Sequence, residues 1–320
     1  MELTVCICTH NRPRYVGDCL TGLRRQTAAP GRFAILIVDS GSTEPYRTEL
    51  QDLLRAYPEV RLIRVDKPGI SAARDAGAMA AGADYIAYID DDAIPAENWV
   101  ETILDAFAAG DSLPAVLGGR ILPIWEAPLP AWWPASLRGV LSIVEHEGKG
   151  EYRTAALPPN LEPYGCNMIV HVRWLLDSGG FGRGIGRVGG VLLSDEDVQV
   201  AWRLQNAGRS VRYDSRIMVY HQIQASRLRP EWLLSRLYWQ GASTVLTRRL
   251  LLNGDAVWRE LPRRLAVGML FAPAVLWPST STRLLWLRWR WAYAAGFVRA
   301  ALGWQPIDAA RRLTQPVAAA

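Results

Sequence analysis

Short apolar runs alternate with amphipathic helical patterns along the first 110 residues. The run at residues 85–89 is bounded by turn-forming residues and neither of its faces is polar, as expected of a strand that is buried on both sides. The runs are residues 3–8, 34–38, 60–65 and 85–89. Between them, apolar side chains recur every three to four residues, which predicts helices. The helices begin near Pro13, Leu50, Ser71 and Trp99. This alternation predicts right-handed βαβ units and an α/β fold with a mostly parallel, Rossmann-like sheet flanked by helices.

The run 85–89 ends in three consecutive aspartates, Asp90, Asp91 and Asp92. Three carboxylates at the end of a buried strand are unfavourable unless a cation lies beside them. Carboxylate oxygens suit Mg²⁺ or Mn²⁺, which often also bind substrate phosphates. The carboxyl edge of a parallel sheet is where open α/β folds bind ligands. The alternative is a solvated acidic turn that caps the next helix, and the triplet alone does not decide between the two.

Several short motifs follow one another along the chain, at residues 5–12, 38–42, 69–77, 90–92, 165–168, 179–181, and 195–197 followed by Arg203 and Gly208. Their order and spacing resemble the family 2 glycosyltransferases over roughly residues 3 to 225. The resemblance implies the GT-A fold, a nucleotide-sugar-binding α/β domain with an Asp-x-Asp metal motif, and an inverting transfer. One departure is Asp75, which stands where the family more often has asparagine.

The resemblance implies a set of donor-binding residues. Arginine suits a phosphate, and a carboxylate suits ribose hydroxyls or a base N–H. For Asp39 the alternative is a turn residue that bonds its own backbone. Asn167 and Cys166 correspond to the wall around the donor sugar. The donor-binding residues implied are Thr9, Arg12, Asp39, Arg74, Asp90, Asp91 and Asn167.

The resemblance also implies a metal site and a general base. Asp92, Asp90 and His221 would hold Mg²⁺ or Mn²⁺, although a lone histidine at the end of a strand is more often a packing residue. Asp197 would take the proton of the acceptor hydroxyl as it attacks the anomeric carbon, with Glu196 as the alternative base. The metal would offset charge on the departing diphosphate. Simple capping of a helix start is the other explanation for these two carboxylates.

Charge divides the chain unevenly. The net charge is +5, but residues 226–320 carry 14 arginines and 4 acids, a balance of +10, together with eight of the 14 tryptophans. Arginine interleaved with tryptophan and leucine is typical of helices that lie in a membrane interface. Packing on the catalytic domain or on a second subunit is the alternative, and a homo-oligomer is left open. Nucleic acid is not expected as a partner, because no recognised motif accompanies the basic residues.

The sequence therefore predicts two domains. Residues 1–225 form the catalytic domain, with a nucleotide-sugar-binding half (1–120) and an acceptor and base half (121–225). Residues 226–320 form a helical, amphipathic, membrane-associating region. Within the first domain, residues 123–161 are expected to form an irregular insertion. The four cysteines form no Cys-x-x-Cys pair and are expected to be buried thiols.

We expect an inverting, metal-dependent glycosyltransferase that takes a UDP-, dTDP- or GDP-linked sugar. The acceptor is a lipid-linked glycan or a growing surface polysaccharide. The N-terminus does not match a signal peptide and no apolar run is long enough to span a bilayer, so a peripheral protein on the cytoplasmic face of the membrane is expected. The alternatives are a soluble enzyme that glycosylates a small molecule or protein, and an inactive sugar-nucleotide-binding scaffold. The sugar, the base and the linkage have no recognisable sequence pattern.

Overall fold

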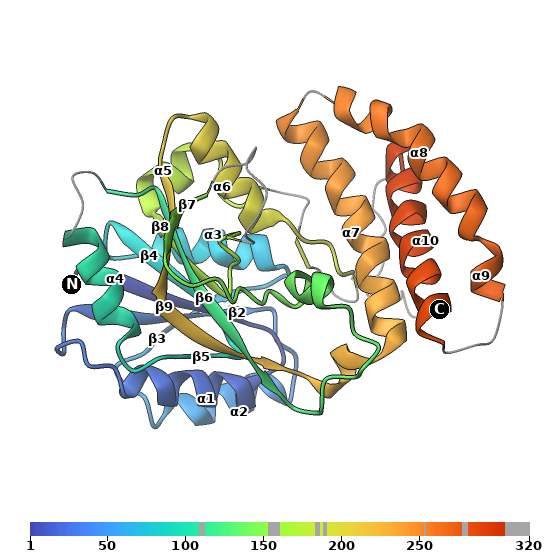
Figure 1. Ribbon diagram of the computed structural model, residues 1–320. Helices are drawn as coiled ribbons and strands as arrows, with labels where there is room; N and C mark the ends of the chain where they lie inside the picture. The colour runs from blue at the N-terminus through green and yellow to red at the C-terminus, as the bar shows by residue number, and fades with distance from the viewer. Residues whose placement is uncertain are drawn as a thin grey trace, which may run out of the picture. The chain divides into compact units, whose positions relative to one another are not determined.

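A computed structural model of the chain describes residues 1–108, 113–152, 161–182, 186–187, 191–252, 254–276 and 281–304 (Figure 1). The chain divides into two compact units. The first comprises Met1–Glu126, Pro134–Gly182 and Val200–Ile223, and the second the described parts of Ala127–Trp133, Arg183–Gln199 and Gln224–Ala320. That residues 1–225 and 226–320 are separate functional domains stays a prediction.

A nine-stranded sheet forms the centre of the first unit within the described residues (Figure 1). Its order is β3-β2-β1-β4-β8-β6-β9-β5, and β7 pairs with β9. The strands are β1 (Leu3–Thr9), β2 (Phe33–Ser40), β3 (Arg61–Val65), β4 (Tyr85–Asp90), β5 (Ala93–Pro95), β6 (Val116–Trp125), β7 (Lys149–Glu151), β8 (Asn167–His171) and β9 (Val211–Ile223).

The first four strands confirm the predicted parallel arrangement. β3, β2, β1 and β4 are parallel neighbours, whereas β8 joins β4 and β6 in antiparallel pairing. The register pairs Thr9 with Asp39 and Cys8 with Asp90. The carboxyl ends of β1, β2 and β4 therefore meet at one edge of the sheet, where the predicted donor-binding residues lie.

The predicted helices of the first 110 residues are present and connect the parallel strands. α1 begins at Pro13, and proline suits the start of a helix. The helix buries Val16, Cys19 and Leu20. The helices are α1 (Pro13–Arg24), α2 (Tyr46–Leu54), α3 (Ile70–Ala80), α4 (Trp99–Ala108) and the later α5 (Val172–Asp177). α6 (Glu196–Asn206) begins in the second unit and ends in the first.

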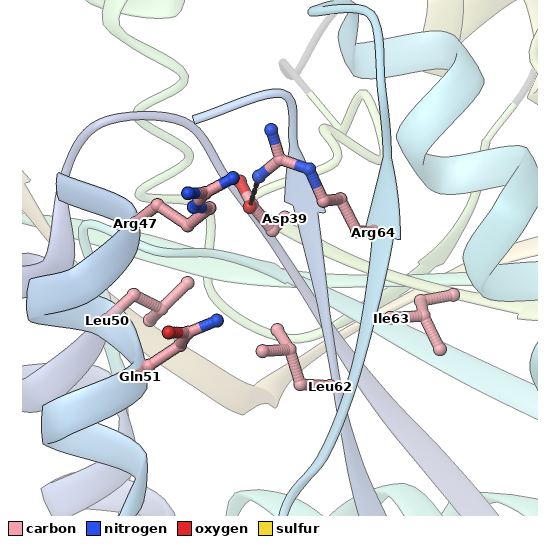
Figure 2. A pocket seen from close by; sticks show the side chains of 7 residues that line it. All are labelled: Asp39, Arg47, Leu50, Gln51, Leu62, Ile63 and Arg64. Atoms are coloured by element: carbon pink, nitrogen blue, oxygen red, sulfur yellow. Dashed lines mark hydrogen bonds and ion pairs between the residues drawn. The ribbon is translucent and has the colours of Figure 1, made fainter. Parts of the chain in front are cut away.

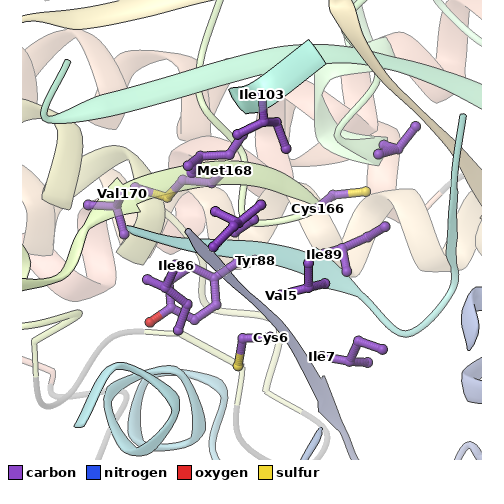
Figure 3. Packing of buried hydrophobic residues seen from close by; sticks show 14 of the residues in the cluster. Val5, Cys6, Ile7, Ile86, Tyr88, Ile89, Ile103, Cys166, Met168 and Val170 are labelled. Carbon is purple, nitrogen blue, oxygen red and sulfur yellow. The ribbon is translucent and has the colours of Figure 1, made fainter. Parts of the chain in front are cut away.

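Apolar side chains of β1, β4 and β8 form the core of the first unit (Figure 3). Every residue of β1 is buried, including Thr4 and Thr9, as its mostly apolar sequence predicts. Full burial of one valine or isoleucine side chain contributes roughly 1.5–3 kcal/mol, so this layer holds the sheet edge in a fixed shape. All four cysteines lie in the described part of the chain, are buried as expected, and are not joined in disulfides.

The segment 123–161 is more regular than expected. β6 continues to Trp125, a 3₁₀ helix spans Ala135–Leu141, and β7 follows; residues 153–160 lie outside the described residues. β9 is 13 residues long and pairs in parallel with β6 as far as Trp125, with Pro123 opposite His221. A long partner strand thus keeps the chain extended where its prolines and tryptophans suggest a loop.

The second unit confirms that the C-terminal region is helical. α7 and α10 approach closely at two glycines, because a Cβ on Gly241 would meet Tyr293 O and one on Gly296 would meet Tyr238 O. Only glycine permits such a backbone contact. The helices are α7 (Pro230–Leu251), α8 (Asp255–Phe271), α9 (Pro273–Leu276) and α10 (Thr282–Ala301).

A separate apolar cluster holds the second unit together. It contains Val191 and Leu193, which precede α6, and residues of α7, α8 and α10. The helical residues are Ala242, Val245, Val257, Leu261, Phe297, Ala300 and Ala301. Glu260 of α8 adds ion pairs with Arg248 of α7 and with Arg264. Among the described residues, no helix combines the length and the apolar character that crossing a bilayer requires.

Candidate active site

Two arginines contact the three consecutive aspartates. Asp91 and Asp92 are 1% exposed, and Arg12 donates to Asp92 Oδ2 at 2.9 Å while also pairing with Asp91. Arg74 of α3 lies 3.3 Å from Asp90 Oδ1. The expected charge compensation is therefore provided in this structure by two guanidinium groups.

The loop between β1 and α1 brings Arg12 to this position. Asn11 has a φ of 57°, in the left-handed region that asparagine tolerates better than most residues. Its backbone N–H donates to Ser42 Oγ at 3.0 Å, and its side-chain oxygen accepts from Thr43 N at 2.9 Å. These bonds fix the loop against the loop after β2, so that Arg12 faces the acidic triplet.

Asp91 is the most firmly held of the three carboxylates. Thr9 Oγ1 donates to its Oδ2 at 2.7 Å, and Arg12 bonds both of its oxygens. Burial raises the pKa of Asp91 to about 6, and the positive charge of Arg12 acts against that rise. These contacts give Thr9 and Asp91 a structural role at the sheet edge, and their binding of the donor stays a prediction.

His221, near the end of β9, faces the same acidic residues. It is 2% exposed, its Nδ1 lies 3.0 Å from the carbonyl oxygen of Leu141, and its Nε2 lies 3.4 Å from Asp92 Oδ1. A carbonyl oxygen can only accept, so Nδ1 carries the hydrogen in this contact and Nε2 faces the carboxylates. A backbone carbonyl behind one ring nitrogen is the usual support of a metal-binding histidine.

Ligand atoms suited to a divalent ion gather here. One oxygen of Asp90, Sγ of Cys166 and one ring nitrogen of His221 all lie within 4.8 Å of one another. With Asp92 beside His221, carboxylate, imidazole and thiol groups converge from β4, β9 and the turn before β8. These residues fit the metal ion that the sequence resemblance implies.

Asp39 is held at the end of β2 by the turn contact considered from the sequence and by an ion pair that the sequence did not predict. Its Oδ1 accepts from Ser42 N at 2.9 Å, which is a turn contact, and its Oδ2 pairs with Arg64 of β3. Figure 2 shows Arg47 and Arg64 on either side of this carboxylate. The pocket beside it has a volume of about 160 Å³ and is lined by Asp39, Arg47, Leu50, Gln51, Leu62, Ile63 and Arg64. Nucleotide binding by Asp39 stays a prediction.

Arg74 is buried between an aromatic ring and a glycine. Its guanidinium carbon lies 5.3 Å from the centre of the Phe181 ring, and Tyr88 Oη donates to its backbone oxygen. A Cβ on Gly165 would lie 1.9 Å from Arg74 Nη2. The glycine of the motif 165–168 is thus required for the arginine to reach Asp90.

The loop Gly179–Gly180–Phe181 is held from two sides. Asp75 Oδ1 accepts from Phe181 N at 2.8 Å, and Arg203 of α6 donates to the backbone oxygens of Ser178 and Gly180. Gly179 and Gly180 have positive φ values, which only glycine adopts without strain. Asp75, the departure from the family pattern, therefore has a structural role in this chain.

Asn167, predicted to line the donor site, is fully buried at the start of β8. Its side-chain oxygen accepts from Trp99 Nε1 at 2.9 Å. Its side-chain nitrogen donates to the backbone oxygens of Arg120 and Ile217. These three bonds tie together α4, β6 and β9, so Asn167 supports the wall of the site, and contact with the donor stays a prediction.

The second acidic cluster opens α6 and lies in the second unit. Asp197 and Glu196 are buried in the first turn of the helix, and Asp197 Oδ1 accepts from Val198 N at 2.8 Å.

Asp195 has a φ of 77° and accepts hydrogen bonds from Gln240 and Ser194. Burial raises the pKa of Asp195, with the bond from Gln240 opposing the rise. Asp195 is thus an anchoring residue that the sequence did not identify, and the roles of Asp197 and Glu196 as bases stay predictions.

Comparison with known proteins shows what the chain is similar to. Residues 4–128 match the sequence profile described as "Glycosyl transferase family 2". A glucosyl-dolichyl phosphate glucuronosyltransferase of Haloferax volcanii is 28% identical over 246 residues, which cover 76% of this chain and 76% of that protein. Over residues 4–128 the chain thus resembles the family 2 glycosyltransferases.

The chain resembles further proteins over most of its length. A pre-mycofactocin glycosyltransferase of Mycobacterium tuberculosis is 26% identical over 259 residues, covering 78% of this chain and 51% of that protein. A mannosyltransferase of Pyrobaculum calidifontis, solved with GDP-Man and Mn²⁺, has a TM-score of 0.57 and 15% identity, covering 93% of this chain and 86% of the other. The likeness in fold confirms the predicted GT-A architecture.

Proposed function

We propose that this chain is a family 2 glycosyltransferase. It transfers a sugar from a nucleotide-diphosphate donor, with inversion and with the help of a divalent metal ion, to a lipid-linked glycan or surface polysaccharide. The observation that carries the proposal is the convergence of Arg12, Asp92 and His221 at the carboxyl edge of the sheet. This is the edge at which α/β folds bind nucleotides. The mannosyltransferase of similar fold, solved with GDP-Man and Mn²⁺, supports the choice of donor and ion.

Asp90, Asp92 and His221 would hold the metal ion, whose chemistry is to offset negative charge on the departing diphosphate. Arg12 is the adjacent cation, and a guanidinium can form paired hydrogen bonds to a phosphate. Arg74 holds Asp90 in place from α3. The chain's own side chains thus supply both the ligands for the ion and a second positive charge for the phosphates.

Asp197 is the proposed base. A carboxylate within hydrogen-bond reach of the acceptor hydroxyl can accept its proton as the new glycosidic bond forms. The burial of Asp197 in the first turn of α6 and the fixed backbone of Asp195 support a rigidly held carboxylate. Such positioning is what a general base requires.

A lipid-linked acceptor is supported by the relative from Haloferax volcanii, whose name specifies a dolichyl phosphate substrate. It is also supported by one face of α8. Trp258, Pro262, Leu265 and Met269 follow one another at spacings of four, three and four residues, and all are exposed. Side chains at this spacing form one stripe along a helix.

Basic residues border this stripe. Arg259 and Arg263 are exposed at its edge, and Arg290 of α10 lies 4.6 Å from the ring of Trp286, which contacts Phe271 at the end of α8. An anionic lipid surface complements such a face, because arginines are attracted to its charge while tryptophan and leucine enter the interface. We therefore include peripheral binding to an anionic membrane in the proposal, with the cytoplasmic face as the proposed side.

A donor and acceptor panel tests the proposal. Purified enzyme is incubated with UDP-, dTDP- and GDP-sugars, with Mn²⁺ or with EDTA, and binding and slow hydrolysis are measured. We expect one nucleotide to bind in a metal-dependent way, and a sugar linked to a lipid phosphate to accept sugar faster than the free sugar does. Equal rates with EDTA would contradict metal assistance, and equal rates with the free sugar would contradict the lipid acceptor.

A further inference from the structure

Cys166 gives the cluster at the sheet edge a chemistry different from that of a purely oxygen-lined site. Its sulfur, an oxygen of Asp90 and a nitrogen of His221 lie within 4.8 Å of one another. Asp90 ends β4, Cys166 directly precedes β8, and His221 lies in β9, so three separate strands bring the atoms together. Carboxylate, imidazole and thiolate form a ligand set of mixed hardness, which first-row transition metals accept and Mg²⁺ does not favour.

The surroundings hold each of the three residues in its orientation. His221 is backed by the carbonyl of Leu141 through Nδ1, and its Nε2 faces Asp92 Oδ1 at 3.4 Å. Cys166 is 1% exposed and is fixed between Gly165, which lies against Arg74, and the fully bonded Asn167. Asp90 is oriented by Arg74. Rigid support of this kind is what distinguishes a formed metal site from a chance group of polar residues.

We infer that the Cys166 thiolate is a direct ligand of the metal ion and that it makes the site selective for Mn²⁺, Co²⁺ or Zn²⁺ over Mg²⁺. When the ion binds, the sulfur–metal bond forms and the thiol proton passes to water. The inference rests on the proposed function only in assuming that a metal ion binds at this edge. It does not depend on the sugar, the acceptor or the identity of the base.

The selectivity follows from the nature of the sulfur ligand. Mg²⁺ requires oxygen ligands in a nearly octahedral arrangement and keeps most of its water. A sulfur atom is therefore a poor ligand for Mg²⁺. Thiolate ligands favour Zn²⁺, and affinity for mixed nitrogen, oxygen and sulfur sites rises from Mn²⁺ towards Co²⁺ and Zn²⁺. We therefore expect an order of affinity of Zn²⁺, Co²⁺, Mn²⁺ and Mg²⁺, with Mg²⁺ the weakest.

Absorption spectroscopy of the full chain with Co²⁺ tests the inference without any measurement of activity. A cobalt–thiolate bond gives a charge-transfer band in the near ultraviolet that oxygen and nitrogen ligands do not give. We expect wild-type protein titrated with Co²⁺ to develop this band, and Cys166→Ser to lose it. We also expect the affinity of Cys166→Ser for Co²⁺ to fall at least 10-fold, since removal of even an outer-shell partner costs about 10- to 100-fold.

Cys6→Ser is the matched control, because Cys6 is equally buried but packs in the core beside Gly77. This variant should keep the band. Cys166→Ala provides a second variant in case the serine disturbs folding, and the far-ultraviolet circular dichroism of each variant is compared with that of the wild type.

Three results would overturn the inference. They are Co²⁺ bound by the wild type without a thiolate band, a band that survives in Cys166→Ser or Cys166→Ala, and the absence of any Co²⁺ binding. Metal assistance of transfer is judged separately, by activity with and without EDTA, so the failure of one proposal is distinguishable from that of the other.

Discussion

Arg12 Nη1 lies 2.9 Å from Oδ2 of Asp92, so the carboxylate proposed to hold a metal ion is already paired with a cation. Asp91 shares the same guanidinium. We therefore predict that a divalent ion bound by Asp92 competes with Arg12 for this carboxylate. Arg12, displaced in this way, would become available to the phosphates that arrive with the ion.

Replacement of Arg12 tests this competition. Arg12→Gln leaves two carboxylates that are 1% exposed without their guanidinium, and unpaired buried charge is destabilising. We expect a lower thermal midpoint without metal and a larger rise on addition of Mn²⁺ than in the wild type. Arg12→Lys keeps the positive charge, so its thermal midpoint and its Mn²⁺-induced rise should lie between those of the wild type and Arg12→Gln. Equal Mn²⁺-induced shifts in wild type and Arg12→Gln would show that the ion and Arg12 do not compete.

The metal-binding role of Asp92 is tested by Asp92→Asn. The variant keeps the size of the side chain but removes the charge, so metal-dependent donor binding should weaken and transfer should be lost. Calorimetric titration of the donor with and without Mn²⁺ measures this effect. Asp66→Asn is the control, because Asp66 is fully exposed, and it should behave as wild type. Wild-type transfer that persists after thorough chelation would exclude the metal.

Asp197→Asn tests the base. Asparagine can still accept the bond from Val198 N, so the helix start is preserved while the basicity is removed. Loss of a general base costs about 10²- to 10⁴-fold in rate, and donor affinity should stay nearly unchanged. Steady-state transfer and donor binding are measured in parallel with Glu196→Gln. Should Glu196→Gln lose transfer while Asp197→Asn keeps it, the base is Glu196.

The exposed stripe of α8 predicts how the protein binds a lipid surface. Met269 is 73% exposed in this stripe, and Met79, on α3 of the first unit, is 70% exposed. Met269→Glu places a charge in the stripe and should reduce sedimentation with vesicles that contain anionic lipid, whereas Met79→Glu should have no effect. High salt should weaken binding only in part, since apolar contacts are not screened. If wild-type protein does not bind anionic vesicles and sediments as a dimer, the stripe is a subunit interface.

Glu260 predicts a pH dependence of stability. Burial acts to raise the pKa of Glu260, but Arg248 and Arg264 outweigh it and hold that pKa below its usual value. The stabilisation is therefore present above the unfolded-state pKa, about 4.3, and is lost as the pH falls through the lower folded-state pKa. Glu260→Gln should lower the free energy of unfolding by about 1–3 kcal/mol at neutral pH and by progressively less in acid. Denaturant unfolding measures this difference.

The exposed pair Glu59–Arg24 supplies the control for this measurement. Both partners are nearly half exposed, so Glu59→Gln should change the free energy of unfolding by at most about 1 kcal/mol. A difference between wild type and Glu260→Gln that does not shrink in acid would show that packing, and not charge, is responsible.

The parallel half of the sheet could be predicted because its signals are local. β1 and β4 consist mostly of apolar residues, and α1 and α4 have clear helical periodicity, so each element is specified by its own residues. β5 and β7 have three residues each, too few to show a periodic pattern, and both pair with β9. Long-range pairing of this kind leaves no mark in the short strand itself.

The residues of the candidate site could be predicted more easily than their contacts. The aspartates, Arg12 and His221 stand out by type and position, and they do meet at one edge. Their contacts join residues that lie up to 80 positions apart in the sequence. Examples are the pairing of Arg12 with Asp92, the pairing of Arg64 with Asp39, and the bonds from Asn167 to three other elements. An isolated sequence does not distinguish an asparagine that binds substrate from one that holds strands together.

The apolar cluster of the second unit joins the C-terminal helices to the residues that precede α6. Val191 and Leu193 precede the proposed base by only a few residues, and their packing partners include Phe297 and Ala300 of α10. A premature stop codon that removes only α10 would leave every proposed active-site codon intact, yet it would take away part of the core that supports the start of α6. In a genetic screen such an allele would score as catalytically null. A family member that exchanged its C-terminal helices by recombination would also have to change residues near 190 at the same time.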